Sequence, residues 1–324
     1  MISDIESNPE WIPHALNTET RSVEFLRVPE ERYSAPGFLF EYAPTDPADR
    51  RSVSFDQVIE MKVEALPLHF IFHTAFCRST LLARALNIPG ISLGMSEPGI
   101  IASLASGGAK AEPLIAPLLR LLGRKRPGID AVFVKPTNHA NRLIPALLRA
   151  QPDARTVLMT NPVSPFLQSV RKRGLMGHRW GRRLYLEMQG YAGIDLGMSP
   201  EEQFSMTDLQ AAGLAWLLNQ NYFTRLASGP LKPRIRTLDG DYFNEHRGEA
   251  IEAVLAFAGV DPGGPGSEML SLDHAFAEHS KLGGKVDQRN ADEAAAEEIE
   301  HVRHWLGLIA GQLKITAPVP QTLV

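Results

Sequence analysis

One segment constrains the fold of this chain more than any other: residues 68–86, which read LHFIFHTAFCRSTLLARAL. An apolar run, FIF, passes through a short loop of small and hydroxyl residues into a run of strong helix formers. The pattern predicts a strand, a turn and a helix in succession. The turn places Arg78, Ser79 and Thr80 where the first backbone N–H groups of a helix lack partners and its dipole is positive. The sequence therefore predicts an anion site at this turn.

The composition excludes several classes of protein. A hydrophobic content of 44% and a charged content of 22% over 324 residues are typical of a folded globular protein. The net charge of −4 argues against a general nucleic-acid binder. No apolar run is long enough for a membrane span, nothing at the start resembles a secretory signal, and the one cysteine, Cys77, cannot form an intrachain disulfide. We expect a cytoplasmic protein without nucleic-acid or membrane partners, and leave its oligomeric state open.

The rest of the chain predicts an α/β domain. Residues 131–134 and 154–159 are short apolar runs typical of buried strands, and helical patterns alternate with them. Such alternation indicates parallel strands joined by right-handed crossovers. Residues 1–52 are rich in proline and show no sustained period, so we expect an irregular N-terminal arm that packs on the body. Residues 53–324 are expected to form one domain.

Polar residues follow three of the predicted strands. They occupy residues 73–80, 135–139 and 160–169. Because ligands collect at the carboxyl ends of parallel strands, these three exits are predicted to form the site.

The turn in residues 68–86 does not have the glycines of a nucleoside-triphosphate P-loop. When Ser79 is placed in the hydroxyl position of G-x-x-x-x-G-K-[ST], Arg78 takes the lysine position. Phe72 and Cys77 then stand where both glycines should be. The sequence therefore disfavours a magnesium-dependent NTPase, and Cys77 is expected to be a small apolar side chain behind the loop.

Four stretches, in order between residues 68 and 260, resemble the sulfotransferase family. They are FHTAFCRSTLLARAL, VFVKPTNHANRLIPALL, RTVLMTNPVSPFLQSVRKRG and IRTLDGDYFNEHRGEAIEAVLAFAGV. The resemblance implies a three-layer P-loop-like fold with a central, mostly parallel sheet flanked by helices. It also implies the donor 3′-phosphoadenosine 5′-phosphosulfate, the product 3′,5′-adenosine bisphosphate, and no metal.

The resemblance also implies which residues bind the donor. The 5′-phosphosulfate loop corresponds to Thr74, Phe76, Cys77, Arg78, Ser79 and Thr80, the 3′-phosphate site to Thr160, Ser169 and Arg171, and a late basic cap to Lys281. The chain departs from the family pattern where the basic loop residue falls on Phe76, the glycine on Arg78 and the 3′-phosphate arginine on Thr160. Arg78 is the candidate to replace the loop cation, and Arg171 or Arg173 to replace the arginine, because guanidinium suits sulfate and phosphate oxygens.

Three residues are candidates for catalysis. His139 or Glu97 would take the proton from the acceptor, and Lys135 would stabilise negative charge on the leaving phosphate. His139 lies four residues after Lys135, whereas the family spacing is two. The histidines at 274, 279, 301 and 304 have neither a nearby cysteine nor the spacing of a structural zinc site, so no metal is expected.

The sequence thus predicts a sulfotransferase that acts on a hydroxyl or amine of a small-molecule acceptor. A non-catalytic nucleotide- or anion-binding relative of the same fold is the alternative. An ATP-dependent small-molecule kinase ranks last, because the loop glycines are missing.

Overall fold

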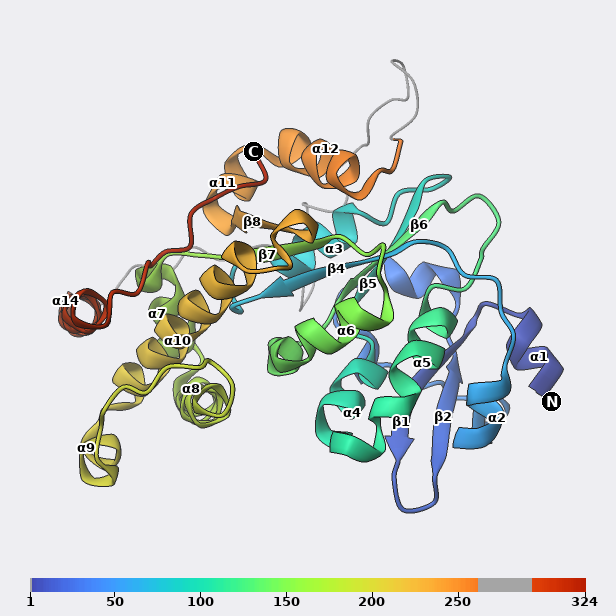
Figure 1. Ribbon diagram of the computed structural model, residues 1–324, viewed down its shortest axis with the longest axis horizontal. Helices are drawn as coiled ribbons and strands as arrows, with labels where there is room; N and C mark the ends of the chain where they lie inside the picture. Colours follow the sequence, from blue (N-terminus) through green and yellow to red (C-terminus); the bar gives the residue numbers. More distant parts are fainter. Residues whose placement is uncertain (1, 262–292) are drawn as a thin grey trace. The chain divides into compact units, whose positions relative to one another are not determined.

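The computed structural model describes residues 2–261 and 293–324 (Figure 1). Two compact units make up the chain. The first contains Met1–Phe72, Ser79–Thr156 and the described residues from Gly248 onward; the second contains His73–Arg78, Val157–Arg247 and residues 293–324.

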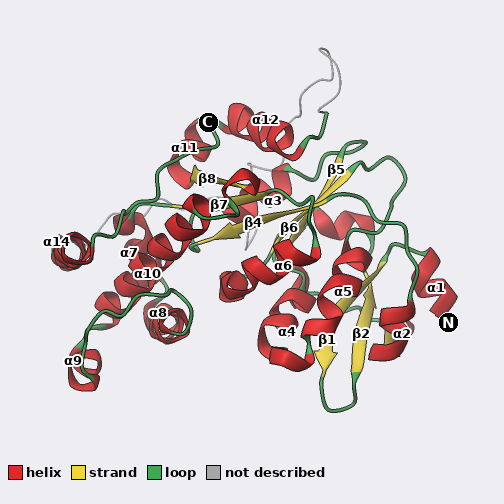
Figure 2. Ribbon diagram, in the orientation of Figure 1, coloured by secondary structure: helices red, strands yellow, loops and turns green. Residues whose placement is uncertain are grey.

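The N-terminal segment is not the irregular arm that the sequence predicted. After α1 (Ile2–Ser7), it forms an antiparallel sheet of β1 (Trp11–Asn17), β2 (Ser22–Arg27) and β3 (Arg50–Ser54); β1 and β2 are labelled among the yellow strands of Figure 2. A register shift between Pro13 and Ala15 interrupts the alternation of β1, and β3 buries one side chain, Val53. Because of these two features, the sequence of β1 and β3 lacks the sustained alternation of apolar and polar residues that indicates a strand. The prediction that residues 53–324 form one domain stays a prediction.

A second sheet confirms the predicted α/β class. Its strands, in the order β5-β6-β4-β7-β8, are β4 (Leu68–His73), β5 (Ser92–Ser96), β6 (Ala131–Lys135), β7 (Thr156–Thr160) and β8 (Ile235–Asp239). β6 pairs in parallel with both β4 and β5. Strand β5 was missed, because its sequence, SLGMS, is short and contains a glycine and two serines. Gly94 in β5 is required by packing, since a Cβ there would lie 1.8 Å from the backbone oxygen of Ala83.

Both units contain helices, which Figure 1 labels along the chain. The first unit contains α2 (Phe55–Glu60), α3 (Ser79–Ala85), α4 (Gly99–Gly107), α5 (Ile115–Leu122) and α6 (Ile144–Ala150). It also contains α12 (Arg247–Ala258) from Gly248 onward. The second contains α7 (Val163–Lys172), α8 (Gly174–Gln189), α9 (Pro200–Ser205), α10 (Asp208–Ser228), α11 (Gly240–Glu245) and α14 (Glu293–Leu313). Capping boxes at Ser54, Ser199 and Thr207 begin α2, α9 and α10, and each follows from a hydroxyl residue with Gln or Glu three positions later in the sequence. Among the described helices, none is long and apolar enough to cross a membrane.

Helix α10 is the core of the second unit. Thirteen of its side chains are buried, and it packs against α7, α8 and α14. The contact with α8 is close, because a Cβ on Gly181 would lie 2.7 Å from the Cβ of Ala212. This packing fixes the position of Trp216, whose indole N–H donates to the backbone oxygen of Asn161.

Strand β4 buries a histidine that makes stability depend on pH. The Nδ1 atom of His69 accepts a hydrogen bond of 3.1 Å from the backbone N–H of Arg155, and the residue is 3% exposed. Burial, with a smaller contribution from the positive charge of Arg155, lowers the pKa of His69 from 6.5 to about 4. In the unfolded chain this imidazole gains a proton near pH 6.5, whereas in the folded protein it stays neutral down to about pH 4.

We therefore expect the free energy of unfolding to fall as the pH drops from 6.5 to 4, with His69 accounting for about 3 kcal/mol of the loss. Asn at this position can still accept the Arg155 hydrogen bond but does not titrate. Urea unfolding of the unsubstituted protein and of His69→Asn, at steps from pH 7.5 to 4.5, should show a steeper loss for the former. Parallel curves would contradict the assignment.

Candidate functional site

The loop predicted to bind the donor, residues 73–78, has an unusual backbone. Ala75, Phe76 and Arg78 have φ angles of 74°, 55° and 62°. Residues other than glycine rarely adopt positive φ, and each such position costs free energy that the surroundings must offset. Strain of this kind is concentrated at binding and catalytic sites, so the loop is a strong candidate.

Asn161, at the exit of β7, holds this loop in place. Its Oδ1 atom accepts a hydrogen bond of 3.2 Å from Thr74 Oγ1, and its Nδ2 donates to the backbone oxygen of Phe76 at 3.4 Å. Trp216 Nε1 in turn donates to the backbone oxygen of Asn161 at 2.9 Å. Asn161 was not among the predicted site residues, although its place in a Thr-Asn-Pro turn after a buried strand was the available signal.

A glycine lets the start of α11 approach the loop backbone. A Cβ on Gly240 would lie 2.5 Å from the backbone oxygen of Cys77 and 3.1 Å from that of Thr160. Cys77 is fully buried, with its Sγ 3.5 Å from the backbone oxygen of Met159. This burial confirms the prediction of a small apolar side chain behind the loop.

The guanidinium of Arg78 is engaged by the same helix. Its Nη1 donates to Asp241 Oδ1 at 2.5 Å and to the backbone oxygen of Gly240 at 3.3 Å. The ion pair is half-exposed. The candidate to replace the missing loop cation is therefore already paired with a carboxylate.

Aromatic side chains and another arginine surround Phe76. The ring of Phe76 lies 5.8 Å from that of Phe166 and 5.1 Å from that of Trp180, centroid to centroid. The guanidinium carbon of Arg173 lies 4.5 Å from the centroid of the Phe76 ring. Burial lowers the pKa of Arg173, although the residue as a whole is exposed. Arg173 thus places a cation beside the position where the sequence lacks one.

The other predicted donor-binding residues are placed as follows. Thr160 is buried at the end of β7. Ser169 lies in α7, where its hydroxyl donates to the backbone oxygen of Pro165 at 2.9 Å, and Arg171 is half-buried in the last turn of that helix. Ser79 and Thr80 begin α3 in the first unit and are buried. Lys281 lies outside the described residues.

Two of the three predicted catalytic residues meet in the first unit. Lys135 Nζ donates to Glu97 Oε1 in a buried ion pair, the Lys135 side chain being 1% exposed and that of Glu97 11%. The backbone brings them together, because Ser96 is the register partner of Lys135 and the N–H of Glu97 donates to the Lys135 oxygen at 2.7 Å. Glu97 has a φ of 51°, so its backbone is strained as well.

Around this pair, the aromatic ring of Phe38 lies with its centroid 5.3 Å from Lys135 Nζ. His139 is half-buried in the 3₁₀ helix η6 (Asn138–Leu143), which follows β6. Both candidate bases thus lie at the exits of the paired strands β5 and β6, and the structure adds that Glu97 contacts Lys135.

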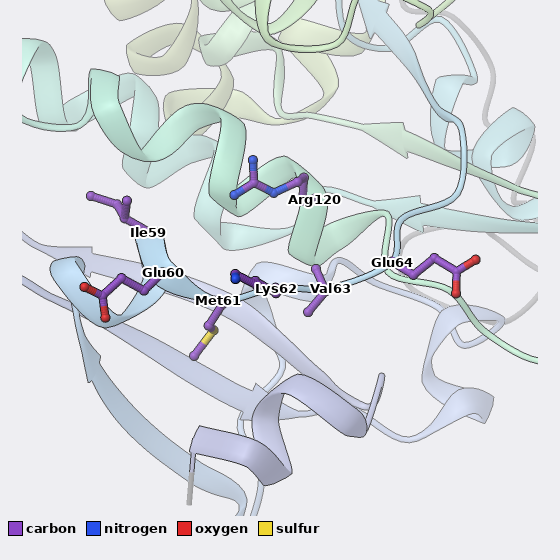
Figure 3. Close-up of a pocket in the computed structure, with 7 residues that line it drawn as sticks. All are labelled: Ile59, Glu60, Met61, Lys62, Val63, Glu64 and Arg120. Atoms are coloured by element: carbon purple, nitrogen blue, oxygen red, sulfur yellow. The ribbon is translucent and has the colours of Figure 1, made fainter.

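A surface cavity of about 670 Å³ lies elsewhere in the first unit. Figure 3 shows its lining, which consists of residues 59–64 and Arg120. Of the predicted site residues that the structure describes, none lines this cavity. The features that mark the candidate residues are the strained backbone of residues 73–78 and the buried Lys135–Glu97 pair.

Comparison with known proteins gives structural likenesses alone. No family model and no curated protein matches the sequence. The structure is similar to that of a sulfotransferase from Alicyclobacillus acidocaldarius, with 14% identity over 78% of this chain and 98% of the other and a TM-score of 0.45. It is also similar to the sulfotransferase domain from the curacin biosynthetic pathway, with 13% identity over 79% of this chain and 100% of the other and a TM-score of 0.41. At these identities the function has to be argued from the chain's own residues.

Proposed function

We propose that the chain is a sulfotransferase that moves a sulfuryl group from 3′-phosphoadenosine 5′-phosphosulfate to a hydroxyl or amine of a small-molecule acceptor. The observation that carries the proposal is the buried Lys135–Glu97 ion pair at the exits of β5 and β6. It joins a base and a cation that the resemblance separately implied for this reaction. The strained loop of residues 73–78 supports the proposal from the second unit. We propose a cytoplasmic enzyme with neither a nucleic-acid nor a membrane partner.

In the proposed reaction the acceptor oxygen or nitrogen attacks sulfur, and the bond from sulfur to the 5′-phosphate oxygen breaks. Glu97 or His139 takes the acceptor proton, and Lys135 offsets the negative charge that develops on the phosphate. The loop from Thr74 to Thr80 would hold the 5′-phosphosulfate. Ser169 and Arg171 would hold the 3′-phosphate. Arg173 would add positive charge beside the loop.

The identity of the donor is tested by comparing how much different nucleotides stabilise the folded protein. 3′,5′-Adenosine bisphosphate is expected to raise the free energy of unfolding by about 2.7 kcal/mol at 100 times its dissociation constant. ATP with Mg²⁺ should give a much smaller effect, because the loop lacks the glycines of a triphosphate site. Thermal unfolding with each nucleotide measures the difference. No shift with millimolar bisphosphate would contradict the proposal.

Arg173 allows a more specific test of the loop charge. Arg173→Met is expected to weaken bisphosphate binding about 10- to 100-fold, because it removes a charge-assisted contact worth about 1.5–3 kcal/mol. Arg179→Met is the matched control, since Arg179 is exposed in α8, the helix that begins directly after Arg173. Calorimetric titration should show a loss for the first variant only. Equal losses would indicate an effect of net charge.

One observation favours the second candidate, a non-catalytic binding protein. Arg78 is paired with Asp241 and Phe76 occupies the basic position of the loop, so the cations next to the 5′-phosphosulfate are fewer than the family pattern requires. Bisphosphate binding without transfer of labelled sulfate to any of a broad set of hydroxyl and amine acceptors would support that candidate.

A further inference from the structure

Two polar side chains in the strand exits that carry the Lys135–Glu97 pair each have a buried atom without a hydrogen-bond partner. Ser96 Oγ and Asn138 Nδ2 make no hydrogen bond in the described part of the chain. The residues are 8% and 5% exposed. A buried donor or acceptor that has lost water without gaining a partner destabilises the protein, so each such group in a folded structure calls for an explanation.

Their place in the fold points to a ligand. Ser96 is the register partner of Lys135 in the parallel pair β5–β6, so the two side chains lie on the same face of the sheet. Asn138 begins η6, three residues beyond Lys135. Four polar side chains, two of them unpartnered, are therefore gathered at the carboxyl ends of two adjacent strands, where ligands bind in parallel sheets.

We propose that Ser96 and Asn138 bind the acceptor, and that the acceptor is a ring polyol, a sugar or cyclitol with a hydroxyl next to the one that reacts. This inference rests on the proposed function. The Asn138 Nδ2 group can only donate, an ionised Glu97 can only accept, and the Ser96 hydroxyl can do either. A diol satisfies all three, since one hydroxyl gives its proton while the neighbouring oxygen accepts from Asn138. An alkylammonium group offers no acceptor. A simple phenol offers one oxygen, which would have to serve Glu97, Asn138 and Ser96 while a lone pair of the same oxygen attacks sulfur.

Aromatic side chains next to the pair suit the same class of acceptor. The rings of Phe38 and Phe40 are stacked, with centroids 5.5 Å apart, and Phe40 is 45% exposed. The N–H of Phe40 donates to the backbone oxygen of Glu97 at 3.0 Å, which fixes this aromatic segment beside the strained residue. Apolar ring faces beside a few convergent polar groups are the usual lining of a small-molecule site, and a ring polyol has both apolar C–H edges and polar hydroxyls.

The test uses the full chain, labelled phosphosulfate donor and four acceptors: methyl α-D-glucopyranoside, myo-inositol, 2-naphthol and hexylamine. We expect sulfate transfer to at least one polyol with a higher kcat/KM than to 2-naphthol or hexylamine. Ser96→Ala and Asn138→Leu are expected to raise the KM for that polyol about 10- to 100-fold and to leave the bisphosphate affinity unchanged. Neither variant should unfold more easily than the unsubstituted protein without ligand, because each removes an unsatisfied group; a purely structural role predicts the opposite.

An unchanged polyol KM in both variants, or equally good transfer to 2-naphthol, would overturn the inference while leaving the sulfotransferase proposal standing. If the protein neither binds the bisphosphate nor transfers sulfate, the proposed function fails. The site is then judged by saturation-transfer NMR with the two polyols. A signal that is lost in Ser96→Ala supports a polyol site, and the absence of any signal in the unsubstituted protein overturns it.

Discussion

Replacing Glu97 with Gln is expected to lower the turnover number for sulfate transfer by about 100- to 10,000-fold, the usual contribution of a general base. Glutamine has the same length and can still accept the hydrogen bond from Lys135, but it cannot take a proton from the acceptor. The Glu97→Gln substitution should therefore slow the chemical step and leave the dissociation constant of 3′,5′-adenosine bisphosphate unchanged. Single-turnover transfer of labelled sulfate, with calorimetric titration of the bisphosphate, measures both quantities.

His139→Gln is the matched variant at the exit of β6. The two replacements distinguish between the two candidate bases. Only replacement of the residue that takes the proton should lower the turnover number by this large factor. If Glu97→Gln retains full transfer, Glu97 has no catalytic role. A loss in His139→Gln would then assign the base to the histidine.

Gly240→Ala is expected to abolish stabilisation by the bisphosphate and to lower the free energy of unfolding by about 1–3 kcal/mol, the usual cost of overpacking. The added Cβ would lie 2.5 Å from the backbone oxygen of Cys77 and 3.1 Å from that of Thr160. Both atoms belong to the main chain, so neither can move away by rotation of a side chain. The strained loop would have to shift, and its hydrogen bonds to Asn161 would shift with it.

Gly307→Ala in α14 is the control, because within the described residues no atom beyond its chain neighbours and its own helix backbone lies within 4 Å of the added Cβ. Alanine in a helix interior is expected to stabilise the protein by about 0.5–1 kcal/mol relative to glycine. Urea unfolding of both variants, with and without the bisphosphate, gives the comparison. A Gly240→Ala protein that binds the bisphosphate normally would show that the loop does not form that site.

The secondary structure near the site was largely predictable, because its signals are local. The apolar run of β4, the capping boxes of α2 and α10 and the polar residues that follow β4, β6 and β7 are all read within a few positions of one another. The parallel class of the central sheet followed from the alternation of strands and helices. Strand β5 and the N-terminal sheet were missed because glycine, serine and a register shift interrupt their patterns.

The partners of the site residues were decided by the tertiary structure alone. Lys135 meets Glu97 across 38 positions of the chain, and Arg78 pairs with Asp241 across 163. Local sequence determines which residues follow a strand, but strand order and register determine which of those residues face one another. The sequence by itself therefore predicted an anion-binding loop and a set of candidate groups. Only the fold showed that the loop is held by Asn161, that Arg78 is already paired, and that Ser96 Oγ and Asn138 Nδ2 are buried without a hydrogen-bond partner in the described part of the chain.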